Sequence, residues 1–180
     1  MSTKYILYYK TNESDTFIAF LGLLEDVKIE EINHQFLVLS IEKEDFDINQ
    51  LRQLSAEELY TDMSSFLLPV NEYLDVEMVM LLLPKLGLGS FDIADLIAMI
   101  GKTQNTYKDY FKDLYVSMFG WETIDSILGF VENDLNASKT SKNLYMHRNT
   151  LNYRLDHFEQ KSGLFIRHFK GAFAFYLLFS

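Results

Sequence analysis

The chain of 180 residues is 48% hydrophobic, carries a formal net charge of −10 and contains no cysteine. This length and composition provide for one sizeable core or two small ones, and the lack of cysteine excludes disulfides and thiolate metal sites. The first residues lack the basic and then apolar run of a signal peptide, and the longest apolar runs, 79–83 and 172–179, are too short to span a bilayer. We therefore expect a soluble, cytoplasmic protein.

The first 68 residues are predicted to form a small α/β unit. Aromatic and β-branched residues are concentrated in two short segments, and apolar residues recur at helical spacing in two others. The core of the second helix is expected to include Leu51, Leu54, Leu59 and Phe66. The predicted elements are strands over 5–9 and 34–41 and helices over 15–24 and 48–68.

Residues 69–120 are predicted to form a helical connecting region. Pro69 should end the preceding helix, because proline cannot continue its hydrogen-bond ladder. Helices are expected over 71–83, 93–100 and 107–119, with a break over 84–90. The last helix should carry Tyr107, Tyr110, Phe111, Leu114 and Met118 on one side. An alternative is that Tyr107, Tyr110, Phe111 and Tyr115 line a ligand pocket.

Residues 121–180 are predicted to form a helix-turn-helix domain. A leading helix over 123–134 is followed by a short helix over 140–144, a tight turn and a longer helix that opens at Arg148. The apolar tail over 165–179 should pack across this unit or across its dimer mate. The expected fold class is therefore α+β and mostly helical, with a small N-terminal α/β unit, a helical region and a C-terminal helix-turn-helix domain.

The spacing of apolar residues supports this reading of the helix-turn-helix. Leu151, Leu155 and Phe158 fall on one helical stripe and should face inward, with Leu144 and Met146 filling the same small core from the turn. Ser141 in the first helix is small, and a small residue there lets two helices approach closely.

The other side of the second helix has the chemistry of DNA recognition. Arg148 could pair with guanine or hold a phosphate, and Asn149 and Asn152 could pair with adenine. Lys139 and Lys142 lie where the first helix would cross the DNA backbone. The predicted DNA-binding residues are Arg148, Asn149, Thr150, Asn152, Tyr153, Arg154, His147, Lys139 and Lys142.

Several of these residues have structural alternatives. Asn149 could cap the helix start, Thr150 could bond back within its helix, and His147 could form a local hydrogen bond. Tyr153 could contact phosphate or pack against the tail. Arg154 could instead form an ion pair that holds the domain together.

The string from His147 to Leu155, HRNTLNYRL, resembles the signature of the PucR/CdaR C-terminal helix-turn-helix. The similarity begins near Glu122-Thr123, ends at Ser162–Leu164, and covers roughly the last third of the chain. It implies a bacterial cytoplasmic transcription factor, often dimeric, whose upstream region senses a small molecule. Members usually have alanine where this chain has Ser141, and typically carry a longer upstream region with a GGDEF-like fold.

The distribution of charge agrees with a nucleic-acid module. From Asn136 onward, seven Lys or Arg residues face two acidic residues, a net charge of +5, whereas the rest of the chain carries −15. Such asymmetry is expected of a DNA-binding segment joined to an acidic body. Since that body would repel phosphate, a homodimer that uses two half-sites is favoured over a monomer.

No catalytic, cofactor or metal site is predicted. His147, His157 and His168 are spaced too widely for one helix face and lack accompanying acids. Gly87-Leu88-Gly89 lacks the further residues of a phosphate-binding loop. No triad-like arrangement is present, so an enzyme is disfavoured.

The sequence thus predicts a regulator that binds double-stranded DNA as a dimer, without a cofactor or a membrane, and that a small-molecule effector could modulate. The alternative is a protein-interaction module that keeps the fold without productive DNA binding, its acidic body docking a basic partner.

Overall fold

The computed structural model describes residues 2–25, 27–33, 35–43, 45–71, 73–103 and 106–180. The chain forms two compact units, Met1–Ile93 and Ala94–Ser180. The fold is α+β and mostly helical, with the sheet confined to the first unit, as predicted. The predicted division at residues 68 and 120 remains a prediction; residues 69–93 lie in the first unit and residues 94–120 in the second.

The first unit is built around a five-stranded sheet in the order β2-β3-β1-β4-β5. Pairing is antiparallel except between β4 and β5. The first six elements follow one another as βαββαβ with β1 and β3 in the centre, which is the split-βαβ, or ferredoxin-like, arrangement. The elements are β1 (Thr3–Lys10), α1 (Ser14–Gly22), β2 (Val27–Asn33), β3 (Phe36–Ile41), α2 (Ile48–Leu59), β4 (Asp62–Leu67), α3 (Val76–Leu86) and β5 (Ser90–Phe91).

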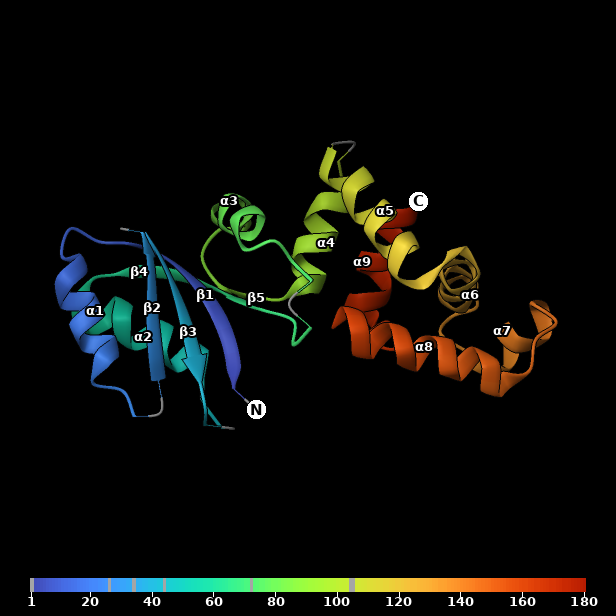
Figure 1. Ribbon diagram of the computed structural model, residues 1–180, viewed down its shortest axis with the longest axis horizontal. Coiled ribbons are helices and arrows are strands. Elements are labelled where there is room, and N and C mark those ends of the chain that lie inside the picture. Colours follow the sequence, from blue (N-terminus) through green and yellow to red (C-terminus); the bar gives the residue numbers. More distant parts are fainter. Residues whose placement is uncertain (1, 26, 34, 44, 72, 104–105) are drawn as a thin grey trace. The chain divides into compact units, whose positions relative to one another are not determined.

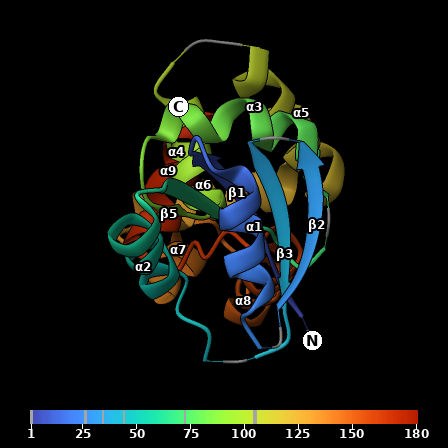
Figure 2. The same cartoon turned by 90° about the vertical axis from the view of Figure 1, so that its left-hand side faces the viewer.

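Alternation along the strands explains how both faces of this sheet are used. Leu7, Leu37 and Leu39 point to one face, where Phe17 of α1 and Leu51 of α2 cover them. On the opposite face α3 packs near β1 and β4. Figures 1 and 2 show α1, α2 and α3 around these strands.

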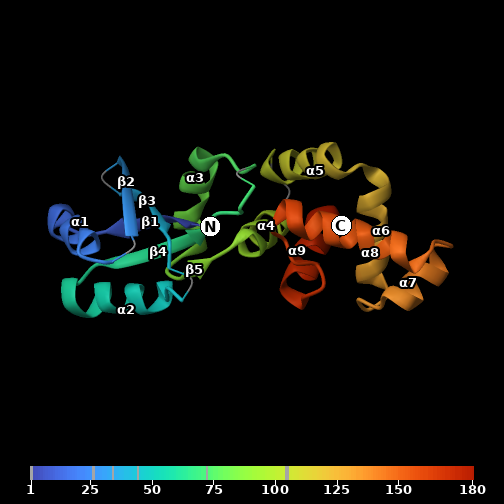
Figure 3. The ribbon, with the colours of Figure 1, turned by 60° about the horizontal axis from the view of Figure 1, so that its bottom comes forward.

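The second unit is entirely helical over its described residues. Its elements are α4 (Ile93–Gly101, which begins at the last residue of the first unit), α5 (Thr106–Phe119), α6 (Trp121–Glu132), α7 (Ala137–Asn143), α8 (Arg148–Ser162) and α9 (Phe169–Phe179). Figure 3 shows α7 beside the beginning of α8, with α6 crossing the same region. No described helix in either unit has the length and apolar character required to cross a membrane.

The predicted helix over 48–68 is wrong beyond residue 59. The α2 helix ends at Tyr60, whose backbone is left-handed, and Asp62–Leu67 forms β4. The cause is that β4 lies between β1 and β5 and is buried on both faces, so its apolar pattern does not alternate and resembles that of a helix. Leu54, predicted in the core, is exposed.

Other elements of the first unit also differ from the prediction. Helix α3 begins after Asp75, whose carboxylate accepts from the Glu77 N–H, and it continues through Pro84 to Leu86, so the break begins later than expected. The edge strand β2 was missed. Residue 34, predicted to open the second strand, lies outside the described residues.

The buried face of α5 is rotated from the predicted one. Lys108, Phe111 and Tyr115 are buried, while Tyr110 is 44% exposed. Lys108 takes a buried position because its ammonium donates to the main-chain oxygens of Gly101 and Ser180, each at 3.2 Å. These carbonyls lie at the C-terminal ends of α4 and α9, where a cation is favourable.

Candidate nucleic-acid interface

The candidate interface is built from α6, α7, α8 and the turns that join them. Asp134 and Leu135 between α6 and α7, and Tyr145 between α7 and α8, all have left-handed backbone conformations. Residues with positive φ reverse the chain within a few positions, so the three helices pack closely despite short connections. A short helix followed by a turn and a longer helix is the helix-turn-helix arrangement.

The inner side of α8 agrees with the prediction. Leu151, Leu155 and Phe158 are at most 1% exposed, which confirms the predicted stripe. The ring of Phe158 meets Phe119 at 4.6 Å and Phe175 of α9 at 5.3 Å between centroids. The tail therefore packs across the recognition unit, which is one of the two predicted positions for it.

The close approach between the helices uses other small residues than Ser141. Thr140 is the fully buried residue of α7, whereas Ser141 is half-buried and its hydroxyl donates to the Ser138 carbonyl. A Cβ at Gly129 of α6 would lie 3.0 Å from Cδ1 of Leu144, so this glycine makes room for the turn. Leu144 itself is 37% exposed, and so fills the small core only in part.

The start of α8 is capped by His147. Its Nδ1 accepts a hydrogen bond of 3.2 Å from the Asn149 main-chain N–H, so the imidazole does what Ser, Thr or Asp usually does at such a position. The local hydrogen bond considered for His147 is therefore present, and the capping role considered for the Asn149 side chain belongs to His147 instead.

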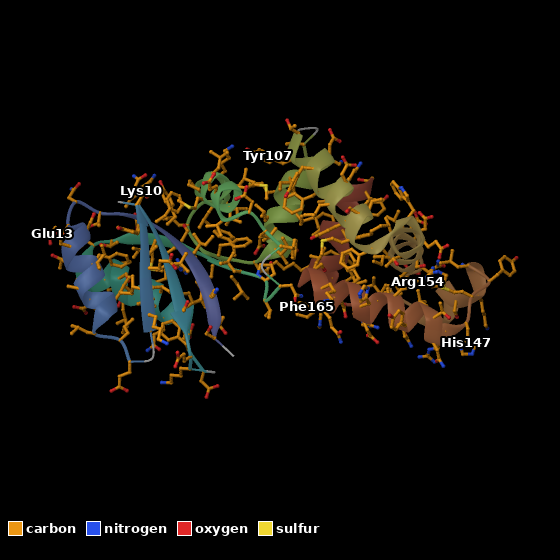
Figure 4. All side chains as sticks on the ribbon, in the orientation of Figure 1. Lys10, Glu13, Tyr107, His147, Arg154 and Phe165 are labelled. Carbon is orange, nitrogen blue, oxygen red and sulfur yellow. The ribbon has the colours of Figure 1, made fainter. Side chains whose placement is uncertain are left out.

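Arg154 is held against α6. Its guanidinium donates to the Glu122 carbonyl at 2.9 Å, to the Ser126 hydroxyl at 2.7 Å and to the Glu122 carboxylate at 2.7 Å. In Figure 4 the labelled Arg154 lies along α8 on the side of α6, and His147 lies at the end of α8 next to α7. Of the two roles that the sequence left open for Arg154, the structure shows the ion pair.

The remaining predicted residues of α8 lie on its outer surface. Arg148, Asn149, Thr150 and Tyr153 are exposed, and Asn152 is half-buried. The ring of Tyr153 is stacked on His157, four residues further along, with planes 4° apart. The structure therefore brings the predicted base-reading side chains together on one accessible surface.

Lys139 and Lys142 are both exposed on α7. The Lys139 ammonium pairs with the Asp134 carboxylate at 2.9 Å, and its main-chain N–H is capped by Asn136. A pair this exposed is weak, so Lys139 can exchange its carboxylate for a phosphate at little cost.

Tyr145 was missed as a candidate. It occupies the turn directly before the cap of α8, has φ of 51° and is 98% exposed. A fully exposed tyrosine contributes little to packing, and Tyr145 becomes a candidate because it lies directly beside the predicted DNA-binding residues at the start of α8. Its sequence signal was only its place between Leu144 and Met146, which were assigned to the core.

Residues 123–180 match the family model described as the PucR C-terminal helix-turn-helix domain. This part of the chain is a PucR-type helix-turn-helix domain.

Two individual proteins are similar to this chain. An uncharacterised protein of Bacillus subtilis strain 168, YxkF, is 45% identical over 49 residues, which is 27% of this chain and 16% of that protein. The crystal structure of a regulator of polyketide synthase expression from Bifidobacterium adolescentis superposes with a TM-score of 0.45 at 14% identity, over 99% of this chain and 80% of that one. The matched segment thus spans a small part of YxkF.

The PucR-type domain has a long stretch without acidic residues. Between Asp134 and Asp156 the sequence contains no Asp or Glu, and this stretch contributes Lys139, Lys142, Arg148 and Arg154. Since Arg154 is turned to α6, the basic side chains on the outside are the other three. The surface formed by α7, the turn and the beginning of α8 is therefore positively charged, as contact with a phosphate backbone requires.

Two of the four aromatic residues considered for a ligand pocket on α5 belong to the core. Phe111 and Tyr115 are fully buried and pack edge to face at 6.1 Å within the core of the second unit. The rings of Tyr110 and Phe111 are nearly perpendicular with centroids 5.5 Å apart, and Tyr110 is partly exposed. Over the described ranges, no group of three or more His, Asp or Glu side chains is placed to hold a metal ion.

Proposed function

We propose that this chain is a sequence-specific DNA-binding transcriptional regulator that acts as a dimer. The observation that carries the proposal is the outer surface of α7 and α8 in the PucR-type domain, which combines exposed Arg, Asn, Thr and Tyr side chains with the acid-free stretch over 135–155. A helix of this composition at the second position of a helix-turn-helix is suited to the major groove.

The residues divide into three roles in this proposal. Arg148, Asn149 and Asn152 read base edges, because bidentate Arg–guanine and Asn–adenine pairs give the strongest discrimination. Lys139, Lys142, Tyr153 and Tyr145 contact phosphates, with Thr150 and His147 beside them. Arg154 positions α8 on α6 without touching DNA.

The first unit would regulate this activity. Its ferredoxin-like sheet forms a compact unit of its own, which supports a separate role in sensing a small-molecule effector or in setting dimer geometry. A DNA-binding function in a bacterium implies a cytoplasmic location, because bacterial DNA is found there.

The test is selection of fragmented genomic DNA on the full chain at about 0.15 M salt, where surface attraction is well screened. Arg148→Ala and Lys112→Ala are run in parallel. Both variants remove one positive charge, but Lys112 lies on α5, outside the helix-turn-helix. We expect a paired half-site motif with the wild type and with Lys112→Ala, and loss of about 1–3 kcal/mol in affinity with Arg148→Ala.

Equal enrichment by both variants would remove Arg148 from the reading surface. Absence of any enriched motif, together with no saturable DNA binding on lowering the salt, would contradict the proposal and favour a protein-interaction module. Lys142→Ala adds a finer measurement: it should reduce the slope of log K against log salt by about 1, the value for one phosphate contact.

A further inference from the structure

Helix α9 is apolar on all sides. Its sequence, FKGAFAFYLLF, contains one charged residue, Lys170. The inner side is packed through five buried residues, Gly171, Ala172, Ala174, Phe175 and Leu178. A helix without a polar face is normally covered all round, since a helix at a protein surface is expected to be amphipathic.

The opposite side of α9 nevertheless carries aromatic rings in contact with solvent. Phe169, Phe173 and Tyr176 are spaced at i, i+4 and i+7 and are 79%, 42% and 42% exposed. Phe165, which precedes the helix and is labelled in Figure 4, is 60% exposed. We call these four residues the α9 aromatic stripe.

The size of the stripe is that of a functional patch. Phe169 and Phe173 are stacked with centroids 5.8 Å apart and planes 10° apart, so the rings form one continuous surface. With about 200 Å² for each aromatic side chain, the exposed part amounts to roughly 400–500 Å². The largest apolar patch of a typical monomer is of this size and often has a function.

We propose that the α9 aromatic stripe is the surface on which a second copy of this chain docks. The inference rests on the proposed function, because a helix-turn-helix protein that reads paired half-sites requires two copies related by a two-fold axis. A standard interface buries about 800 Å² on each partner, so the stripe supplies half or more of what a stable dimer needs.

The charges around the stripe favour self-association over a charged partner. In a two-fold interface the same patch meets itself, so a patch with charge at its centre would repel its copy. The stripe is neutral, and the only charged side chain of α9, Lys170, is paired with Asp95 of α4 at 2.7 Å. Two antiparallel copies of α9 would place Phe173 against its own equivalent and Phe169 against Tyr176 of the other copy.

The docking surface is coupled directly to the recognition helix. Phe175, on the inner side of α9, packs edge to face on Phe158 of α8 with centroids 5.3 Å apart. A dimer formed through α9 therefore fixes the separation and angle of the two α8 helices. This is the quantity that decides which half-site spacing is read.

Sedimentation velocity of the full chain over a range of concentrations tests the inference. The double variant Phe169→Glu, Phe173→Glu is compared with Trp121→Glu, a matched control at a 60% exposed aromatic residue of α6. We expect a wild-type dimer, the same dimer with the control, and self-association at least about a hundredfold weaker in the double variant, because like charges would face each other. Circular dichroism checks that the helices persist.

A second measurement uses the absence of cysteine in the chain. Phe173→Cys should form a symmetric disulfide dimer on mild oxidation, whereas Trp121→Cys should not. A wild-type chain that remains a monomer up to about 0.1 mM, or a dimer that the double variant leaves unchanged, would overturn the inference.

These outcomes separate from those of the proposed function. A double variant that is monomeric yet enriches single half-sites supports both. A wild-type dimer that depends on α9 but binds no DNA would refute the function and leave the docking surface intact. DNA binding by a chain whose dimer does not involve α9 would support the proposed function and refute the docking surface.

Discussion

The guanidinium of Arg154 donates hydrogen bonds to both the main chain and the side chain of Glu122. One amino group donates to the Glu122 carbonyl and to the Ser126 hydroxyl, and the other donates to the Glu122 carboxylate. The Glu122 side chain is 87% exposed, while the Arg154 side chain is 22% exposed and Ser126 is buried. Of the three bonds, the one to the Ser126 hydroxyl is the most sheltered from water, so we expect it to contribute most to stability.

Replacement of Arg154 should destabilise the second unit more than replacement of its acidic partner. We expect Arg154→Ala to cost about 1.5–3 kcal/mol in the free energy of unfolding, since the hydroxyl of the buried Ser126 loses its charged donor. Glu122→Ala should cost less than about 1 kcal/mol, because an exposed carboxylate is screened by water. The measurement is urea denaturation followed by circular dichroism and by Trp121, the only tryptophan.

Lys28→Ala provides the control for Arg154. Lys28 pairs with Glu42 at 2.6 Å, and the hydrogen bond between them raises the pKa of Lys28 and lowers the pKa of Glu42. Both side chains are exposed, so no measurable change in stability is expected despite the short distance. Equal effects of Arg154→Ala and Glu122→Ala would instead assign the stabilisation to the exposed ion pair.

Two glycines of the second unit should not tolerate a side chain. A Cβ at Gly171 would lie 2.2 Å from the Phe165 main-chain oxygen, and a Cβ at Gly101 would lie 2.7 Å from the main-chain carbon of Leu177. Because backbone cannot move aside as a side-chain tip can, we expect Gly171→Ala to cost about 3 kcal/mol or more. Thermal unfolding measures this.

Gly22 serves as the control for the two glycines. It ends α1, and nothing lies within 4 Å of the position of its Cβ. Gly22→Ala should be neutral or stabilising by up to about 1 kcal/mol, as expected from helix propensity alone. A Gly171→Ala variant as stable as Gly22→Ala would contradict the close packing of α9 on the segment before it.

Substitutions of two exposed tyrosines with left-handed backbone conformation should distinguish an effect on stability from an effect on DNA binding. Tyr60 ends α2 with φ of 48° and is 90% exposed, and Tyr145 in the turn before α8 has φ of 51° and is 98% exposed. Asparagine tolerates this conformation better, so Tyr60→Asn and Tyr145→Asn should each stabilise the protein by about 0.5–1 kcal/mol.

Only the second of these variants should change DNA binding. If Tyr145 contacts phosphate, Tyr145→Asn weakens binding to all operator sequences alike, while Tyr60→Asn leaves it unchanged. Titration of labelled operator measures the affinities. Unaltered affinity in a stabilised Tyr145→Asn variant would mean that this tyrosine does not contact DNA.

The two roles of His147 can be distinguished by asparagine. Alanine removes the cap of α8 and should cost about 1 kcal/mol in stability, whereas asparagine is among the best capping residues and should restore it. We expect His147→Asn to be as stable as the wild type and to bind DNA more weakly, since the predicted contact is lost. Full affinity of His147→Asn would assign this residue to capping alone.

The sequence predicted the second unit better than the first. In α8, the period of Leu151, Leu155 and Phe158 reflects one buried face, and the structure confirms it. In β4, burial on both faces removes the alternation by which a strand is recognised, so its residues were assigned to a helix. Such burial depends on pairing with β1 and β5, which are distant in the chain, and local pattern does not contain it.

In the candidate site, too, local pattern predicted some features, while others depend on residues distant in the chain or on backbone conformation. The spacing of the apolar stripe predicted that Arg148, Asn149 and Tyr153 would be exposed, because residues opposite such a stripe face outward. The sequence did not decide between DNA contact and an ion pair for Arg154, because the partners of Arg154 lie 28 and 32 residues earlier in the chain. It also missed Tyr145, because the left-handed turn that exposes this ring is a feature of backbone conformation and not of residue type.

The packing of α9 also determines when the second unit can fold during synthesis. Gly101 of α4 meets Leu177 of α9, and Asp95 pairs with Lys170, so the earliest and latest helices of this unit are in contact. Asp95 and Lys170 are 75 residues apart in the chain, so Lys170 is synthesised several seconds after Asp95 at ordinary elongation rates. The ferredoxin-like unit is complete well before then. Until α9 emerges, Phe158 can pack on Tyr115 and Phe119 of α5 but lacks Phe175, so the recognition helix has the support of α5, α6 and α7 without that of α9.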